Sequence, residues 1–275
     1  DDQDGVQNPL GMAAARLEVN VHIVTGSVTS AQNIIKCCNQ SGLDVEDIVL
    51  EPLSSSQAVL SPDEQEVGVV LVDIGGGTTD ITIYSEGSIV HTAVLALGGN
   101  HLTHDIAIGI GAPLHEAEEI KHNYGVAMSS MVKEDEMIDV PSVGGRNNRT
   151  MKKRVLASII EDRFREIFEL ITHEIEKTHF HTLMASGVVI TGGTCIMPGA
   201  DRLASQVLNL PVRVGYPENI AGLREMIYSP KYATSVGLVR YGITSNQGKL
   251  NFVGDDTNLF NKVSRRMKDW MQDFF

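Results

Sequence analysis

The sequence has few cysteines, few basic residues and no long apolar run. Of its three cysteines, Cys37 and Cys38 are adjacent and Cys195 stands alone, so neither a disulfide framework nor metal-ligand spacing is present. No stretch approaches the ~20 consecutive apolar residues of a membrane-spanning helix, and no basic-then-apolar signal peptide opens the chain. We therefore expect a protein of a reducing compartment that does not cross a membrane.

The shortage of basic residues excludes one class of partner. The chain carries 22 Lys and Arg residues against 35 Asp and Glu residues, which gives a net charge of −13. Such a balance repels nucleic acid, and it repels anionic lipid wherever basic residues are not clustered. We expect no nucleic-acid partner, and contact with an anionic membrane only at a local basic cluster.

Length and the first residues bear on the extent of the protein. The chain has 275 residues, of which 42% are hydrophobic. Because single cores stop growing near ~250 residues, two domains are the better expectation. Residues 1–5 contain no initiator methionine and resemble a loop from the middle of a longer chain. We expect an N-terminal truncation.

Hydrophobic periodicity predicts an α/β protein, in which strands and helices alternate with glycine at the junctions. We expect strands at 16–25, 67–72, 79–84, 88–95 and 187–191, and helices at 30–40, 100–110, 115–123, 155–175 and 200–208. The segment 129–150 is polar. Residues 244–258 are also polar and predict a flexible linker of roughly 20 Å end to end.

The sharpest motif is Asp-Ile-Gly-Gly-Gly-Thr-Thr-Asp at 73–80. It follows a buried strand and leads into a second strand, so it is neither a Walker loop nor a Rossmann fingerprint. Three glycines allow backbone N–H groups to surround phosphate oxygens, and Asp73 is placed to hold Mg²⁺ through water. A glycine-rich hairpin without a ligand is the alternative. The combination with Asp73, Thr78 and Asp80 favours the phosphate site.

A second glycine element is Val-Val-Ile-Thr-Gly-Gly-Thr at 188–194. It ends a buried strand in Gly192 and Gly193 before a helix, which lets the backbone pack flat against an adenine ring. Close packing of a helix on a strand is the alternative. Its occurrence after the first glycine turn predicts two walls of one cleft.

These two elements resemble the second phosphate motif and the adenosine motif of the superfamily of actin, sugar kinases and DnaK-type chaperones. Residues 51–58 and 230–238 resemble its two connecting helices, and 22–26 and 140–146 are similar to the FtsA family in particular. The resemblance covers essentially the whole chain. It implies an actin-like (RNase H-like) ATPase fold with FtsA-type subdomains, which is partial because the first phosphate motif is missing.

The resemblance also implies a division of the chain into subdomains. The expected parts are the end of subdomain 1C (1–26), part of 1A (27–65), 2A (66–127 and 184–229), 2B (128–183), a helix returning to 1A (230–243), the linker (244–258) and an amphipathic membrane-targeting helix (259–275).

ATP and Mg²⁺ are the cofactors that the resemblance implies. The residues expected to contact the nucleotide or orient the metal are Asp73, Gly75, Gly76, Gly77, Thr78, Glu118, Lys121, Gly192, Gly193 and Met197. Asp73 orients Mg²⁺, the turn contacts the phosphates, and Glu118 and Lys121 match a Glu-x-x-Lys pair at the ribose and adenine. The alternative for that pair is an exposed helical i,i+3 contact worth a few tenths of a kcal/mol.

Glu51 lies where actin-like ATPases place a residue that activates water. It is a candidate general base. A solvated glutamate before a proline is the alternative, and the resemblance implies a weak ATPase at most.

The last 17 residues predict an amphipathic helix. Its apolar face contains Leu259, Phe260, Val263, Met267, Trp270, Met271, Phe274 and Phe275, and its polar face includes Lys262, Arg265, Arg266 and Lys268. Such a helix is expected to lie in the headgroup plane of an anionic membrane. Docking on the protein's own core is the alternative.

A second basic cluster lies in the expected subdomain 2B and consists of Arg146, Arg149, Lys152, Lys153 and Arg154. The resemblance implies that 2B receives the C-terminal peptide of the tubulin-like FtsZ. Arg146, Arg149 and Lys153 are candidate contacts for acidic groups of that peptide. A solvated loop and helix start is the alternative.

The resemblance implies a cell division adaptor at the cytoplasmic face of the membrane, at the division site. Its expected partners are FtsZ, further copies of itself in a polymer, the membrane and other division proteins. The alternatives are an enzyme of the same superfamily, such as a sugar kinase or phosphatase, and a PilM-like component of pilus assembly. The terminal amphipathic helix is the feature that separates the adaptor from these alternatives.

Overall fold

The computed structural model describes residues 5–6, 9–19, 21–140, 149–178, 184–220 and 224–250, with no side chains given for 224 and 246–250. The chain divides into two units, residues 1–238 and 239–275. The second unit is described only as the later part of helix α9 (Ala233–Leu250). All of the following geometry belongs to the first unit.

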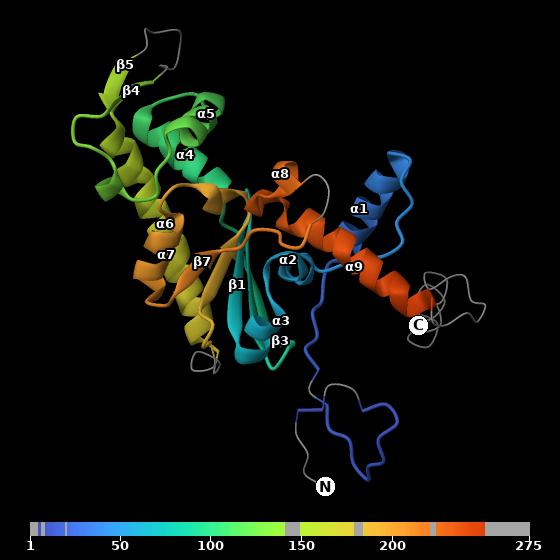
Figure 1. Cartoon of the computed structure of the whole chain (residues 1–275). Helices are drawn as coiled ribbons and strands as arrows, with labels where there is room; N and C mark the ends of the chain where they lie inside the picture. Colours follow the sequence, from blue (N-terminus) through green and yellow to red (C-terminus); the bar gives the residue numbers. More distant parts are fainter. Residues whose placement is uncertain are drawn as a thin grey trace, which may run out of the picture. The chain divides into compact units, whose positions relative to one another are not determined.

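A five-stranded mixed sheet forms the centre of this unit (Figure 1). Its strand order is β3 (Ser88–Leu95), β2 (Thr79–Ser85), β1 (Val69–Ile74), β6 (Val188–Thr191) and β7 (Val212–Val214). Strands β1, β2 and β3 are antiparallel, whereas β1, β6 and β7 are parallel. All residues of β1 are buried, as expected for a central strand covered on both faces.

One face of the sheet is covered by α4 (Gly99–Ile110), α6 (Lys153–Glu176) and α7 (Ala200–Leu208), with α5 (Leu114–Tyr124) packed against α4 (Figure 1). We call this the apolar face. Helix α6 supplies a buried stripe that includes the stacked rings of Phe164 and Phe168, whose centroids are 5.7 Å apart. Hydrophobic burial of this extent is the main source of folding free energy.

The opposite face of the sheet is covered by α2 (Glu51–Val59) and the first turns of α9. Its apolar cluster is small and consists of Ala58, Val59, Leu60, Val69, Leu71, Tyr84, Val189 and Ala233. Buried polar residues lie among these side chains, namely Ser54, Ser55, Ser56, Asp73, Asp80, Thr82 and Thr191. We call this the polar face.

The remaining elements surround the sheet. They are α1 (Val28–Gln40), α3 (Pro62–Val67), α8 (Arg224–Ile227), the short 3₁₀ helices η1 (Ser129–Met131), η2 (Gly193–Ile196) and η3 (Pro230–Tyr232), and a hairpin of β4 (Met137–Val140) and β5 (Arg149–Lys152). Helix α3 begins with a capping box between Ser61 and Glu64, and Glu64 also pairs with Arg213 of β7 at 2.7 Å. This pair fixes α3 to the edge of the sheet.

Most predicted elements are confirmed, and the structure differs from the sequence analysis in three places. Residues 16–19 and 21–25 form no strand, and Leu17 and Ile23 are 64% and 77% exposed, because no other strand in the described residues pairs with them. The polar segment 129–150 contains the unpredicted β4–β5 hairpin. Residues 244–250, the first part of the linker predicted over 244–258, belong to α9, whereas 251–258 lie outside the described residues.

No helix in the described part of the chain is both long enough and apolar enough to span a bilayer. The predicted amphipathic helix 259–275, with Phe260, Val263, Arg265, Arg266, Met267, Trp270, Met271, Phe274 and Phe275, lies outside the described residues. The same holds for Arg146 and for the rest of 141–148.

Candidate nucleotide-binding site

The two predicted glycine turns meet at the carboxyl ends of parallel strands. Asp73 of β1 is in register with Thr191 of β6, so the turns that follow both strands emerge side by side. The Thr194 hydroxyl donates a hydrogen bond of 2.9 Å to the Gly75 carbonyl and joins them directly. Ligands of open α/β sheets bind at this kind of strand end.

Backbone hydrogen bonds hold the first turn in one orientation. The Gly75 N–H donates to the Thr78 carbonyl at 2.9 Å, and the Gly75 carbonyl accepts from the Gly99 N–H at 2.9 Å. The Gly76 carbonyl accepts from the Asn100 N–H at 2.7 Å. The carbonyls of the turn therefore face the first turn of α4.

The opposite side of the turn carries unused donors. Among the hydrogen bonds of the described residues, none is donated by the amides of Gly76, Gly77 and Thr78, and all three residues are exposed. Successive free N–H groups of this kind form an anion-binding nest. The predicted phosphate contacts thus fit Gly76, Gly77 and Thr78, while the Gly75 amide is used within the turn.

Two glycines are required by close approach. A Cβ at Gly98 would lie 2.7 Å from the Gly75 carbonyl oxygen. Gly192 has a φ of +92°, and a Cβ there would lie 2.4 Å from Oδ1 of Asp73. A side chain at Gly98 would push the first turn away from the start of α4, and one at Gly192 would push the second turn away from Asp73 and Ile74.

Three carboxylates converge beside the turns. Burial, followed by the charges of Asp80 and Asp73, raises the pKa of Glu51 above its ordinary value. Burial also raises the pKa of Asp73, and burial and the Asp73 charge raise that of Asp80. Repulsion among these carboxylates favours the binding of a cation or a proton between them.

This arrangement fits magnesium held through water. Within the described residues, no group of three or more ligating side chains is close enough to hold a metal ion directly. Mg²⁺ keeps most of its hydration shell and binds through few carboxylates together with phosphate oxygens. Asp73 and the nearby carboxylates match that requirement, and the raised pKa of Glu51 suits a residue that accepts a proton from water.

Glu118 and Lys121 form an ion pair of 2.7 Å, but Lys121 is only 10% exposed. Its ammonium also donates to the Gly99 carbonyl at 3.1 Å and to the Thr103 hydroxyl at 2.8 Å. Burial alone would raise the pKa of Glu118, but hydrogen bonds from Lys121 and Thr103 lower it overall. The pair connects α5 to the first turn of α4, so the alternative of an exposed helical contact is wrong for Lys121.

The predicted adenine-pocket residues lie on the second turn. Gly193 is exposed, and a Cβ there would lie 3.7 Å from the Lys231 side chain. Met197 is half-buried, and its methyl group lies 2.9 Å from the position that a Cβ at Gly125 would take. Met197 therefore borders the C-terminal end of α5, on the same side as Lys121.

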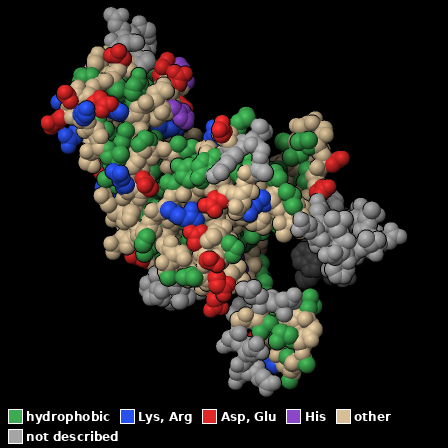
Figure 2. Space-filling model, in the orientation of Figure 1, with side chains coloured by type: hydrophobic (Ala, Val, Ile, Leu, Met, Phe, Trp, Pro, Cys, Tyr) green, Lys and Arg blue, Asp and Glu red, His purple; other side chains and the backbone are tan. Residues whose placement is uncertain are grey.

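The predicted basic cluster is largely paired within the chain. Lys153 forms an ion pair of 2.7 Å with Glu136 and is 17% exposed, and Arg154 lies 3.4 Å from Glu134. Arg149 is exposed and donates to the Ile110 carbonyl at the end of α4. On the face shown in Figure 2, Lys and Arg side chains lie scattered among Asp and Glu side chains. Charge alone is therefore a weak basis for the FtsZ contact.

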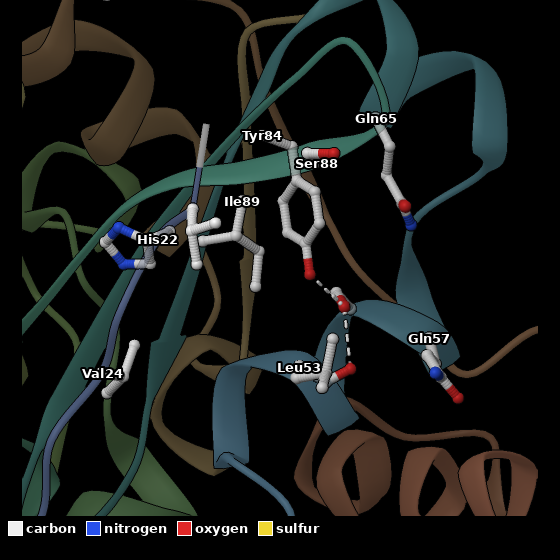
Figure 3. Close-up of a pocket in the computed structure, with 11 residues that line it drawn as sticks. His22, Val24, Leu53, Gln57, Gln65, Tyr84, Ser88 and Ile89 are labelled. Atoms are coloured by element: carbon white, nitrogen blue, oxygen red, sulfur yellow. Dashed lines mark hydrogen bonds between the residues drawn. The ribbon is translucent and has the colours of Figure 1, made fainter. Parts of the chain in front are cut away.

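A cavity of about 470 Å³ is lined by the middle of α2 and by β2 and β3, with no residue of either glycine turn in its wall (Figure 3). Leu53, Gln57, Gln65, Ser88 and Ile89 are among its lining residues. In its wall the Tyr84 hydroxyl donates to the Ser56 hydroxyl at 2.6 Å. No predicted site residue lines this cavity.

Sequence reasoning missed four polar residues of the site, namely Ser55, Asn100, Thr194 and Thr234. The hydroxyls of Ser55 and Thr234 contact Asp73, while Asn100 and Thr194 hold the first glycine turn. Each of these four residues is distant in sequence from the residue it contacts, so no motif in the sequence indicates the contact. Only the neighbourhood of Thr194 to Gly193 gave a signal.

Two family models match the chain. The family described as "Cell division protein FtsA" matches residues 70–237, which is more than half of the chain. The domain described as "SHS2 domain inserted in FTSA" matches residues 1–25.

Curated relatives extend the match along the chain. Over 280 aligned residues the sequence is 42% identical to the cell division protein FtsA of Pseudomonas aeruginosa, and over 283 it is 38% identical to that of Escherichia coli strain K12. Both alignments cover the whole of this chain and 67% of the relative. The chain spans 58% of the relative from Neisseria meningitidis, which is 44% identical over 87% of this chain.

Solved structures show the same fold. MreB5 of Spiroplasma citri bound to ADP matches with a TM-score of 0.67 and 19% identity, over 82% of this chain and 69% of that chain. The same protein bound to AMPPNP gives 0.65 and 20% identity, over 82% and 68%. At such identities the likeness concerns the fold alone, and it confirms the predicted actin-like α/β fold.

Proposed function

The chain belongs to the FtsA family of cell division proteins, and from this premise we propose that it is an ATP-binding adaptor that polymerises and anchors the FtsZ ring to the cytoplasmic membrane. The observation that carries the nucleotide part is the junction of two glycine turns, with free amides on one side and carboxylates beside them. MreB5, which shares the fold, is known with bound ADP and with bound AMPPNP.

In this proposal each residue at the junction has a defined task. The amides of Gly76, Gly77 and Thr78 bind phosphate oxygens, and Asp73 orients hydrated Mg²⁺. Gly192, Gly193 and Met197 border the adenine, and the ion pair of Glu118 and Lys121 lies near the ribose. Mg²⁺ supplies neutralising charge for the phosphates when it is bound. Glu51 accepts a proton from water, and hydrolysis is slow at most.

Membrane attachment is proposed for residues 259–275. The cationic polar face of this segment, in a chain of net charge −13, is the sequence feature that supports it. Single-helix affinity is modest, so stable attachment needs several copies acting together. Polymerisation of the actin-like body supplies those copies.

The FtsZ contact is proposed for a different part of the chain. The region of the β4–β5 hairpin and α6 receives the FtsZ peptide.

Two other functions are weighed against the adaptor. A sugar kinase or phosphatase of the same superfamily needs a substrate-binding aspartate near the cleft and has no use for a terminal amphipathic helix. A PilM-like pilus component shares the fold at 18% identity, which is far below the 42% identity to the FtsA relative. Family membership along the whole chain favours the adaptor.

Co-sedimentation with anionic liposomes tests the proposal. The full-length protein is compared with a variant that lacks residues 259–275 and with an Arg265→Glu/Arg266→Glu variant, each with ATP and FtsZ. We expect the intact protein to carry FtsZ into the pellet and the deletion to leave both in solution, because the apolar face of the helix is lost. The charge-reversal variant should bind the liposomes more weakly than the intact protein. Its binding free energy should fall by at least roughly 1 kcal/mol for each basic residue lost.

Either of two results would contradict the adaptor. If the deletion pellets as well as the intact protein, the helix is part of the protein's core and the enzyme alternative becomes the stronger one. If the protein pellets without FtsZ, membrane attachment stands and the FtsZ contact is wrong.

A further inference from the structure

Three consecutive serines of α2 are buried against the sheet. Ser54 and Ser55 are 0% exposed and Ser56 is 1% exposed. Buried hydroxyls in native proteins nearly always have hydrogen-bond partners. Each of these serines donates to a different acceptor: Ser54 to the Thr234 carbonyl, Ser55 to Asp73 and Ser56 to the Leu53 carbonyl, while Ser56 also accepts from the Tyr84 hydroxyl.

Two hydroxyls converge on a single oxygen of Asp73. Ser55 Oγ donates to Oδ2 of Asp73 at 2.7 Å, and Thr234 Oγ1 lies 3.4 Å from the same oxygen. The two hydroxyls are themselves 3.0 Å apart. Asp73 is 5% exposed, so these contacts replace solvent at Oδ2. Its other oxygen faces Gly192 in the second glycine turn.

The two hydroxyls come from two different helices that touch at this point. Ser55 belongs to α2, and Thr234 belongs to the first turn of α9. The Ser54 hydroxyl donates to the Thr234 carbonyl at 2.7 Å. A Cβ at Gly237 would lie only 1.8 Å from the Ser54 carbonyl oxygen, so the helices approach this closely only with glycine at 237.

We propose that Ser55 and Thr234 are positioning residues of the nucleotide site, which fix the Asp73 carboxylate and thereby make metal binding depend on the contact between α2 and α9. The inference rests on the proposed function, because it assumes that Asp73 orients Mg²⁺ beside ATP. Both hydroxyls stabilise the ionised form of Asp73 against burial, and their hydrogen bonds oppose the rise in its pKa. By reciprocity, metal-nucleotide binding stabilises the same helix contact.

The test is a Mg²⁺ titration of the binding of a fluorescent ATP analogue to the full-length protein. Ser55→Ala and Thr234→Val each remove one hydroxyl, and we expect each to raise the Mg²⁺ midpoint about tenfold, as for a lost hydrogen bond to a charged group. Thr234→Ser keeps the hydroxyl and should restore a midpoint near that of the wild type. Nucleotide affinity in EDTA should stay within about twofold for all three.

Ser56→Ala is the matched control, because Ser56 is equally buried on the same helix and does not contact Asp73. Its midpoint should equal that of the wild type. Gly237→Ala adds a methyl group against Ser54, which would force α2 and α9 apart, and it should shift the midpoint in the same direction as Ser55→Ala. Thermal unfolding identifies any variant that does not fold. If Ser55→Ala does not fold, the comparison of Thr234→Val with Thr234→Ser tests the inference, because Thr234 is only half-buried and its substitution disturbs the core less.

The outcomes separate the inference from the proposed function. If Ser55→Ala and Ser56→Ala shift the midpoint equally, or if Thr234→Val and Thr234→Ser do, the hydroxyls have a structural role only and the inference is overturned. If the wild type binds no ATP at any Mg²⁺ concentration, the proposed nucleotide site is wrong and the inference falls with it.

Discussion

The two faces of the central sheet are buried in different ways. On the apolar face, α4, α6 and α7 cover an extended core in which Phe164 and Phe168 are fully buried. On the polar face, α2 and the start of α9 cover a small cluster that contains hydroxyls and carboxylates. Strand β1 contributes to both, with Val72 on the first and Asp73 on the second.

This difference separates stability from ligand response. Apolar burial is non-directional and grows with area, so the apolar face stabilises the fold without fixing a particular ligand geometry. Hydrogen bonds to a buried carboxylate depend on direction and on charge. We therefore expect the polar face, more than the apolar face, to respond to protonation and to a bound metal or nucleotide.

The largest expected effect is on the apolar face. Phe168→Ala should lower the free energy of unfolding by about 3–5 kcal/mol, because it removes a fully buried ring and leaves a cavity. Urea unfolding followed by circular dichroism measures it. Ile108→Ala is the control, since Ile108 is 81% exposed on α4 and should change stability by less than about 0.5 kcal/mol. A loss below 1 kcal/mol for Phe168→Ala would show that the core is loosely packed.

On the polar face the effect should be on ligand binding instead. Asp73→Asn should weaken Mg²⁺-dependent ATP binding about 10–100-fold, because the carboxylate that orients the metal is neutralised. The ligand-free protein should lose no stability, since the repulsion among Asp73, Asp80 and Glu51 is relieved. Isothermal titration calorimetry and thermal unfolding measure the two quantities. Asp63→Asn, at an exposed position of α3, should change neither.

The pH dependence of stability should differ in sign between two carboxylates. The folded-state pKa of Asp73 is raised by burial, so its contribution favours folding at acidic pH and is lost as the pH rises through that pKa. Burial alone would raise the pKa of Glu64, but hydrogen bonds from Arg213 and Ser61 lower it overall. The contribution of Glu64 is therefore present above its ordinary pKa and is lost as the pH falls through its folded-state pKa.

Urea unfolding across the acidic range tests this difference. Relative to Asp73→Asn, the ligand-free wild type should lose stability as the pH rises through the folded-state pKa of Asp73. Relative to Glu64→Gln, it should lose stability as the pH falls. If the stability difference between wild type and variant changes with pH in the same direction for both variants, the carboxyl of Asp73 is exposed to solvent and its pKa is not raised.

The smallest effect is expected for the ion pair of Glu118 and Lys121, which connects α5 to the first turns of α4. Lys121→Met removes the ammonium that holds the Gly99 carbonyl and Thr103, and it keeps the apolar stem. We expect a loss of about 1 kcal/mol in stability and a weakening of ATP binding of a few fold, since the first turn of α4 also holds the glycine turn. Arg154→Met, which breaks the exposed pair with Glu134, is the control and should change neither.

The sequence predicted the apolar face better than the polar face. A continuous apolar run followed by glycines identifies β1 and its turn, and the stripe of α6 identifies a core helix, because both signals are local. The strand expected at 16–25 is wrong, because the alternation of apolar and polar residues is a local pattern. It does not show whether another strand is present to form hydrogen bonds with this segment. The roles of Ser55 and Thr234 were out of reach, since they arise from a contact between residues 179 apart.

The first part of the predicted linker is helical for a different physical reason. Residues 244–250 are polar and include Gly248, which favours irregular structure in a short window. Once α9 has started at Ala233, each further residue adds a hydrogen bond without a new nucleation cost, so the helix continues to Leu250.

The pinned glycine turn has a consequence for the thermodynamics of binding. Glycine residues lose more conformational entropy on ordering than any others, and a glycine-rich loop usually loses that entropy when its ligand arrives. Here the carbonyls of Gly75 and Gly76 accept hydrogen bonds from the amides of Gly99 and Asn100 in α4, which fix the turn from within the protein itself. Phosphate should therefore meet a preorganised set of amides, and its association should be fast and carry little entropic penalty from the loop.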